Sequence, residues 1–308
     1  KPFAEVDITA EYDKMVANPE IRKTPINARE LEQELSKLQQ ESGYPYIVNV
    51  DTVNQANPVD GVISMSNLCS EILQVQTPSV LNDDQTYKVV GTDVACNLGS
   101  TNVLNLMTSS DEFGTSVESM VRALTFISET SNLDTVPTVR KGNDEMHAIG
   151  LGAMGLHSFL AQNQIHYDSK EAVEFTSVYF MLLNYYTLVA SNKLAVEKGA
   201  SFKNFEKSAY ADGSYFDKYL THDYFAAVSP KVQELFKGIA VPTIADWTEL
   251  RDTVKTSGLY NSYRMAVAPN GSISYINDCS SSIHPIVNRI EERQEKKVGK
   301  IYYPAAGL

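Results

Sequence analysis

Apolar residues recur at helical spacing along several stretches of the chain. After Asn27, which together with a glutamate three residues later is typical of a helix start, leucines repeat until Gly43, where we predict the end of a first helix. Apolar positions on one side predict a second helix over Ser116–Ser128. The longest predicted helix, Glu171–Lys198, ends at Gly199, and its apolar centre indicates burial in a core.

Shorter runs of β-forming residues lie between these helices. Tyr46–Val50, Arg264–Ala268 and Ile301–Tyr303 predict strands, and Asn54–Gly61 predicts a loop. A further helix, unusually rich in glycine, is predicted over His147–Leu160. Strands that alternate with long helices favour an α/β fold with parallel strands.

The composition is that of a globular protein with an acidic surface. The 308 residues allow one large domain or two ordinary ones. A formal net charge of -12 argues against non-specific binding of nucleic acid, which requires a basic surface. An anionic ligand would therefore be held by local backbone dipoles. Polar residues interrupt the most apolar stretch, Phe175–Val189, so it is too short to span a membrane.

The cysteines and histidines do not form a recognisable metal site. Cys69, Cys96 and Cys279 have no zinc spacing, and the five histidines are scattered, so we predict no metal bound by this chain. The sequence shows no secretory signal pattern, and the odd cysteine count is not typical of a disulfide scaffold. Reduced thiols and a cytoplasmic location are the expectation.

Asn67, Cys69 and Glu71 form the most informative group in the sequence. In an extended segment their spacing places all three side chains on one face. An amide that binds hydroxyls, a thiol and a carboxylate able to accept a proton would together suit chemistry on a diol. The alternative is a buried structural cysteine beside a solvated glutamate.

Pro269–Ser274 is a second candidate site, because a predicted strand runs directly into this polar, glycine-containing turn. Successive backbone N–H groups in such a turn can bind phosphate without a cationic side chain. The alternative is an ordinary turn. Cys96 is placed at the end of another probable strand, with Asn97 and Gly99 shaping the turn that follows; taken alone, it would be a buried, inert cysteine.

Gly150–Gly155 matches the pattern G-x-G-x-x-G of dinucleotide-binding loops. Such a loop requires a hydrophobic strand immediately before it, whereas Lys141–Met146 is polar and charged. We therefore attribute the glycines to close helix packing. A nicotinamide-dependent oxidoreductase remains an alternative that a strand ahead of Gly150 would support.

Four motifs in this order resemble those of the large, catalytic subunit of class I ribonucleotide reductase, most closely its bacterial class Ib branch. They are Glu41–Asp51, Asn67–Glu71, Cys96–Val103 and Ala268–Ser274. The resemblance covers nearly the whole chain. It implies a ten-stranded α/β barrel built from two five-stranded halves, with a central finger loop that carries the radical cysteine.

The resemblance also implies that residues 1–308 are a partial catalytic barrel domain. The finger-loop motif is 67–71, and the phosphate loop consists of Pro269, Asn270, Gly271, Ser272, Ile273 and Ser274. The N-terminal effector region, the first barrel strands and the C-terminal cysteine tail of the family are expected to be absent. A split-gene product, an excised region and a processed piece all remain open.

The resemblance assigns a role to each candidate residue. Cys69 would be the thiyl radical that takes hydrogen from C3′ of the ribose, Glu71 the base for the 3′-hydroxyl, and Asn67 the group that holds the hydroxyls. Cys96 would be one of two reducing cysteines. Its partner comes from an earlier strand of the family, and neither Cys69 nor Cys279 matches it.

Partners follow from the same resemblance. No cofactor would be bound in this chain: a metal-containing small subunit would supply the radical, and a thioredoxin- or glutaredoxin-like dithiol protein the electrons. A dimer of large subunits is expected. Tyr302 and Tyr303 lie too early to match the tyrosine pair of the family's radical pathway, so we assign them to structure. The alternative function is that of an inactive fragment that only binds a nucleotide.

Overall fold

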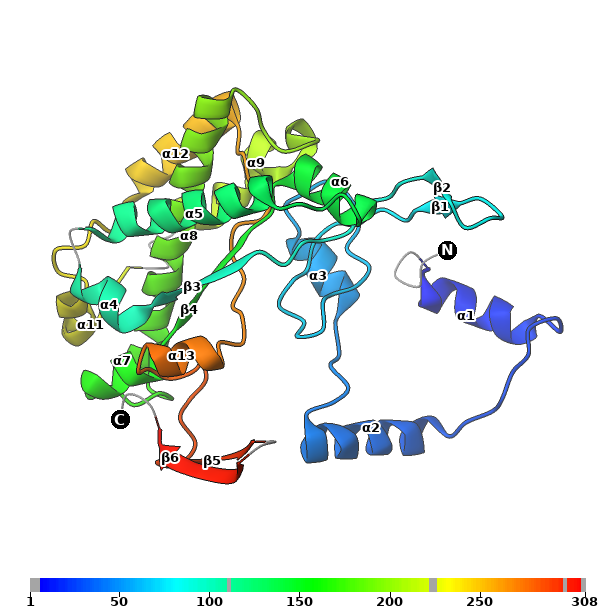
Figure 1. Ribbon diagram of the computed structural model, residues 1–308, viewed down its shortest axis with the longest axis horizontal. Helices are drawn as coiled ribbons and strands as arrows, with labels where there is room; N and C mark the ends of the chain where they lie inside the picture. The colour runs from blue at the N-terminus through cyan, green and yellow to red at the C-terminus, as the bar shows by residue number, and fades with distance from the viewer. Residues whose placement is uncertain (1–5, 110–111, 222–225, 296–297, 306–308) are drawn as a thin grey trace. The chain divides into compact units, whose positions relative to one another are not determined.

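The computed structural model describes residues 6–109, 112–221, 226–295 and 298–305. These residues belong to two compact units, each of which is described by itself (Figure 1). Unit 1 comprises residues 1–57 and 61–76, and unit 2 comprises residues 58–60 and 77–308.

The described part of unit 1 contains three helices, none of which has a buried residue. They are α1 (Ile8–Ala17), α2 (Ala28–Ser42) and α3 (Val50–Ala56). The prediction for α2 is confirmed at both ends: the side chain of Asn27 accepts hydrogen bonds from the first turn, and Gly43 closes the helix in the left-handed conformation.

The predicted strand Tyr46–Val50 is wrong. Asn49 is the N-cap of α3, and Val50 is the first residue of that helix. Asparagine is favoured at helix starts, and the part of unit 1 that the structure describes offers no strand with which the segment could pair. The predicted loop Asn54–Gly61 likewise begins later, because α3 continues to Ala56.

A parallel sheet forms the centre of unit 2. Strands β3 (Leu98–Asn102) and β4 (Gly150–Met154) pair in parallel, and Leu151 pairs in parallel with Met265 on the other side. The N–H of Leu151 donates to the carbonyl of Arg264 at 2.9 Å. The predicted strand Arg264–Ala268 is therefore present as a short paired segment, and the prediction of parallel strands is confirmed.

The predicted glycine-rich helix over His147–Leu160 is wrong in its first half. Gly150–Met154 is strand β4, and helix α7 (Leu156–Gln162) begins only after Gly155. Neighbouring strands leave no room for side chains here: a Cβ on Gly152 would lie 2.3 Å from the carbonyl oxygen of Ala266. The glycines serve close strand packing, not helix packing.

Two long helices that the apolar periodicity predicts are present in unit 2. The helix predicted over Ser116–Ser128 is α5 (Phe113–Thr130), and the longest is α8 (Lys170–Lys198), closed by Gly199. Phe175 and Tyr179 of α8 are fully buried. The ring of Phe175 stacks on Phe159 at 4.6 Å and on Phe236 at 5.3 Å. This aromatic cluster lies in the core of unit 2.

The remaining elements of unit 2 surround this centre (Figure 1). The helices are α4 (Val103–Thr108), α6 (Pro137–Met146), α9 (Ala209–Asp212), α10 (Asp217–Leu220), α11 (Pro230–Leu235), α12 (Ile244–Ser257) and α13 (Ser272–Ile276), with 3-10 turns at Phe205–Lys207 and Ser214–Phe216. The strands are β1 (Val80–Leu81), β2 (Tyr87–Val89), β5 (Ile290–Glu295) and β6 (Gly299–Pro304).

The outer strands form antiparallel hairpins, β1 with β2 and β5 with β6. Strand β6 confirms the strand predicted over Ile301–Tyr303. Within the described ranges the strands make three two-stranded sheets, so the structure contains part of an α/β sheet and not a closed barrel. No helix in these ranges is both long and apolar enough to cross a membrane.

Candidate functional site

Residues 67–70 of unit 1 form a tight turn and not an extended segment. The N–H of Ser70 donates to the carbonyl of Asn67 at 3.1 Å, and Ser70 adopts a left-handed φ of 64°. The prediction that Asn67, Cys69 and Glu71 share one face of a strand is therefore wrong in its geometry, since the turn interrupts the alternation of side chains.

The turn nevertheless presents its three polar side chains in distinct ways. Cys69 is exposed, so it is not the buried structural cysteine of the alternative interpretation. Asn67 accepts a hydrogen bond from the N–H of Ile72 at 3.0 Å through its Oδ1. Oxygen Oε2 of Glu71 is buried and has no hydrogen-bond partner among the described residues. Such an oxygen is costly to leave unpaired.

Tyr44 and Tyr46 are neighbours of the turn that the sequence analysis did not single out as site residues. Their rings are 4.7 Å apart and tilted by 32°. The pKa of Tyr46 is raised, chiefly by its hydrogen bond with Tyr44 and in a smaller part by the charge of Cys69. The Tyr46 phenol thus feels the charge of the Cys69 thiol within unit 1.

Cys96 of unit 2 is exposed and precedes strand β3. The prediction that it ends a strand is wrong: β3 begins at Leu98, and Gly99 lies within it. Asn97 fixes the entry to the strand, because its carbonyl accepts from the N–H of Gly150 at 2.9 Å and its side chain donates to the carbonyl of Leu124. The thiol is therefore presented at the start of β3.

The segment Pro269–Ser274 follows the short stretch around Met265 that pairs with Leu151 of β4, and it leads into α13. Asn270 is buried, and its side chain bridges β3 and β4. Its Nδ2 donates to the carbonyl of Ala153 at 3.2 Å, and its Oδ1 accepts from the hydroxyl of Ser100 at 3.0 Å. The amide is thus directed at the sheet.

Gly271 faces open space, since a Cβ built on it would meet no atom within 4 Å. Its φ of -77° is accessible to any residue, so the backbone does not require glycine here. The first N–H groups of a helix have no acceptor within the helix. In α13 the N–H of Ser274 already donates to the carbonyl of Gly271 at 3.2 Å, so the groups at the helix start that remain are those of Ser272 and Ile273.

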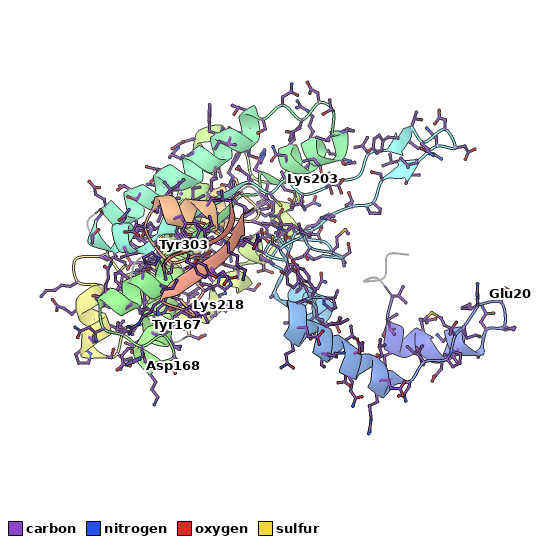
Figure 2. All side chains as sticks on the ribbon, turned by 60° about the horizontal axis from the view of Figure 1, so that its bottom comes forward. Glu20, Tyr167, Asp168, Lys203, Lys218 and Tyr303 are labelled. Carbon is purple, nitrogen blue, oxygen red and sulfur yellow. The ribbon has the colours of Figure 1, made fainter. Side chains whose placement is uncertain are left out.

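Helix α7 and the residues just before it hold the segment that follows α13. The N–H of Gly155 donates to the carbonyl of Ser280 at 2.8 Å, and Ser158 and Ser280 exchange hydrogen bonds between hydroxyl and backbone. The hydroxyl of Tyr167, which is labelled in Figure 2, donates to the carbonyl of Ile283 at 2.5 Å. Both ends of α13 are therefore anchored.

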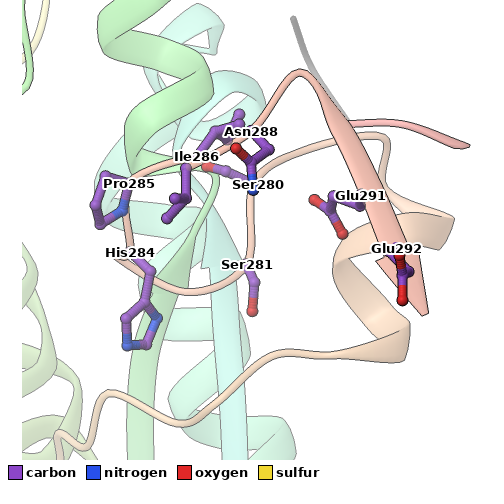
Figure 3. A pocket seen from close by; sticks show the side chains of 9 residues that line it. Ser280, Ser281, His284, Pro285, Ile286, Asn288, Glu291 and Glu292 are labelled. Atoms are coloured by element: carbon purple, nitrogen blue, oxygen red, sulfur yellow. The ribbon is translucent and has the colours of Figure 1, made fainter. Parts of the chain in front are cut away.

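A hollow of about 280 Å³ lies beside this segment. Figure 3 shows Ser281, His284 and two glutamates of β5 around it. The carboxylates already have partners: Glu291 accepts from the hydroxyl of Tyr275 at 2.8 Å, and Glu292 pairs with a lysine of β6. No group of residues in the described ranges could hold a metal ion.

Unit 2 thus brings together β3, which follows Cys96, and the segment Pro269–Ser274. Asn67, Cys69 and Glu71 are held together in unit 1. Cys279 belongs to neither group: it is buried against Gly155, and burial raises the pKa of its thiol to about 11. That pKa is typical of an unreactive cysteine.

Two further sequence hypotheses concern the tyrosine pair and the glycine motif. Tyr302 and Tyr303 lie in β6, where the ring of Tyr303 contacts the ring of Tyr275 at 5.5 Å, and their assignment to structure stays a prediction. Helix α6 (Pro137–Met146) lies ahead of Gly150, and the glycines themselves form β4. A dinucleotide loop, which follows a strand, is therefore not present at this position.

Comparison with known proteins gives a consistent family. The model of the ribonucleotide reductase barrel domain matches residues 2–308. The ribonucleoside-diphosphate reductase subunit alpha of Mycoplasma pneumoniae is 47% identical, and the match covers 100% of this chain. The proteins of the same name from Mycoplasma genitalium and Bacillus subtilis are 46% and 44% identical. The chain spans 43% of the length of each of these three relatives.

Proposed function

Because the chain belongs to the ribonucleotide reductase family, we propose that it is the central catalytic part of a class I large subunit. The reaction is the reduction of ribonucleoside diphosphates to deoxyribonucleoside diphosphates. The observation that carries the proposal is the continuous match to the barrel domain over residues 2–308, which contains every candidate residue.

Cys69 begins the reaction as a transient thiyl radical that takes the hydrogen atom from C3′ of the ribose. Glu71 accepts the proton of the 3′-hydroxyl, and water leaves from C2′. Cys96 and a partner cysteine outside this chain then reduce the keto intermediate by two electrons and become a disulfide, and Cys69 returns the hydrogen atom to C3′, which regenerates its thiyl radical. The exposed positions of Cys69 and Cys96 support these roles, since both thiols must reach a substrate.

Two features of the turn support the division of roles within it. Oε2 of Glu71 lacks a donor among the described residues, and a 3′-hydroxyl would supply one. Oδ1 of Asn67 is already engaged by the N–H of Ile72, which leaves its Nδ2 to donate to a ribose hydroxyl. Asn67 thus shapes the turn and positions the substrate.

The loop Pro269–Ser274 holds the diphosphate through backbone N–H groups at the start of α13. The open space in front of Gly271 supports this role. An uncharged site suits a protein whose net charge of -12 would repel an anion.

The remaining parts of the enzyme come from other polypeptide segments and subunits. A metal-containing small subunit supplies the radical, and a thioredoxin- or glutaredoxin-like protein supplies electrons. The large subunit forms a dimer in the cytoplasm. Further strands complete the ten-stranded barrel around the finger loop 67–71.

Complementation tests the proposal. The purified chain is assayed for ribonucleotide reduction with small subunit and dithiol, with and without the remaining segments of the large subunit. We expect turnover only in the complemented mixture and its loss with Cys69→Ser. Nucleotide binding without turnover in the complemented mixture would instead favour an inactive, nucleotide-binding fragment.

A further inference from the structure

Asn270 occupies a central position in the hydrogen bonding of unit 2. Its side chain reaches across the parallel sheet to the carbonyl of Ala153 in β4 and to the hydroxyl of Ser100 in β3. Its own carbonyl accepts from the hydroxyl of Ser281 at 2.6 Å. Three separate segments of the chain are therefore tied to one residue.

Each polar atom of the amide has a partner within the protein. The side chain is buried. The amide oxygen accepts from the hydroxyl of Ser100 in β3, while the amide nitrogen donates to the carbonyl of Ala153 in β4. A side chain used in this way fixes the loop to the sheet.

We propose that Asn270 is a positioning residue that holds the phosphate loop in register with β3, the strand that begins two residues after Cys96. The proposal deepens the proposed function and rests on it, because it assigns the loop's diphosphate contacts to backbone groups that Asn270 places.

The register matters because the substrate is held at one point and reacts at another. The distance between the diphosphate and the ribose is fixed by covalent bonds, so a loop displaced relative to β3 misplaces the ribose relative to Cys96. The bridge from Asn270 to Ser100 joins residues 170 positions apart and is the direct link between the two elements.

A double-mutant cycle in the complemented large subunit tests the assignment. Asn270→Ala removes both side-chain bonds, and we expect the dissociation constant for a nucleoside diphosphate to rise roughly tenfold. Ser100→Ala should give a smaller rise, and the double variant should be no worse than Asn270→Ala alone, because the two residues act as one unit.

Asn277→Ala is the matched control. The side chain of this exposed asparagine bonds only to the carbonyl of Ile273 within the same segment. Binding should be unchanged in this variant. Equal weakening by Asn277→Ala, or no effect of Ser100→Ala together with strong weakening by Asn270→Ala, would overturn the proposal.

Hydrogen exchange separates this proposal from the proposed function. In Asn270→Ala, amides of residues 269–276 should exchange at least about tenfold faster, while those of α8 keep their protection. This readout needs no nucleotide. If the unaltered enzyme binds no nucleoside diphosphate, the proposed function fails, while hydrogen exchange still decides the role of Asn270. Unchanged exchange in Asn270→Ala would refute the positioning role of Asn270 even if the enzyme binds nucleotide.

Discussion

Units 1 and 2 hold their proposed site residues in contrasting ways. In unit 2 the phosphate loop is tied to β3 and to the fully buried strand β4, and the segment after it is tied to α7. The core of this unit contains fully buried aromatic residues. In unit 1 the turn at Cys69 lies in a segment anchored by a few buried residues, such as Ile63 and Ile72, and none of its helices has a buried residue.

The difference indicates which of the two groups of proposed site residues the described chain can order by itself. Helical stability in proteins comes mainly from burying one apolar face, and leucines of α2 such as Leu31 and Leu38 are exposed. The relatives are more than twice as long as the match, so they contain further polypeptide that could cover such a face. We therefore expect unit 1 to gain order on assembly.

The largest expected effect is on the chemistry assigned to unit 1. In the complemented enzyme, Cys69→Ser should lower nucleotide reduction at least roughly a thousandfold, because a hydroxyl cannot replace the thiyl radical. The folded state should be unaffected, since Cys69 is exposed. Reduction rates and circular dichroism measure both.

The control for this variant is Met65→Leu, which changes an exposed side chain of the same segment. It should retain activity. Substantial reduction by Cys69→Ser would remove Cys69 from the mechanism, and loss of activity in both variants would show that the segment is merely sensitive to change.

A pair of core and surface truncations tests the contrast in packing. Phe175→Ala should lower the free energy of unfolding of unit 2 by about 3–5 kcal/mol, because it leaves a cavity among stacked rings. Leu31→Ala on exposed α2 should change stability by less than about 0.5 kcal/mol. Denaturant unfolding of the two variants provides the values. Similar losses would show that α2 is packed as firmly as α8.

Two glycines in open space give a smaller and more selective effect. Gly271→Ala meets no atom within 4 Å at an ordinary φ, so folding should be preserved. The added methyl group would occupy the space proposed for the diphosphate and should weaken nucleotide binding roughly tenfold. Calorimetric titration with a nucleoside diphosphate measures this.

Gly43→Ala is the counterpart in unit 1. It also meets no atom, but its φ of 77° is left-handed, so alanine should cost about 1 kcal/mol of stability without a direct effect on binding. Unchanged nucleotide affinity in Gly271→Ala would argue against a ligand in front of the loop.

The sequence predicted the elements whose signals are local. Asn27 and Gly43 mark the ends of α2, and the apolar period of α8 persists over its whole length. Strand β4 was missed because glycines carry no side-chain pattern; its identity comes from pairing with β3, which lies some fifty residues away.

The sequence indicated which residues form the candidate site better than it indicated how they are arranged in space. The residues Asn67, Cys69 and Glu71 could be selected from their chemistry, but the left-handed Ser70 that turns the chain between them has no strong sequence signal. The bridge from Asn270 to Ser100 could not be found at all, because nothing local relates two such distant residues.

The smallest expected effect is a pH dependence confined to unit 2, since unit 1 contains no histidine. His147 stacks on the ring of Tyr260 at 4.1 Å, and burial lowers its pKa, against the opposing influence of Glu129 and Asp144. The unfolded chain therefore binds this proton at a higher pH than the folded one. Stability is present above the ordinary histidine pKa of about 6.5 and falls as the pH decreases below it.

His147→Asn isolates the contribution, because asparagine tolerates the left-handed φ of 45° found here and does not titrate. As the pH falls from about 7 to about 5, the unaltered chain should lose unfolding free energy relative to this variant. His157, whose pKa burial also lowers, remains in both proteins and cancels. A constant difference for His147→Asn would show that burial of the imidazole in unit 2 does not couple its protonation to folding.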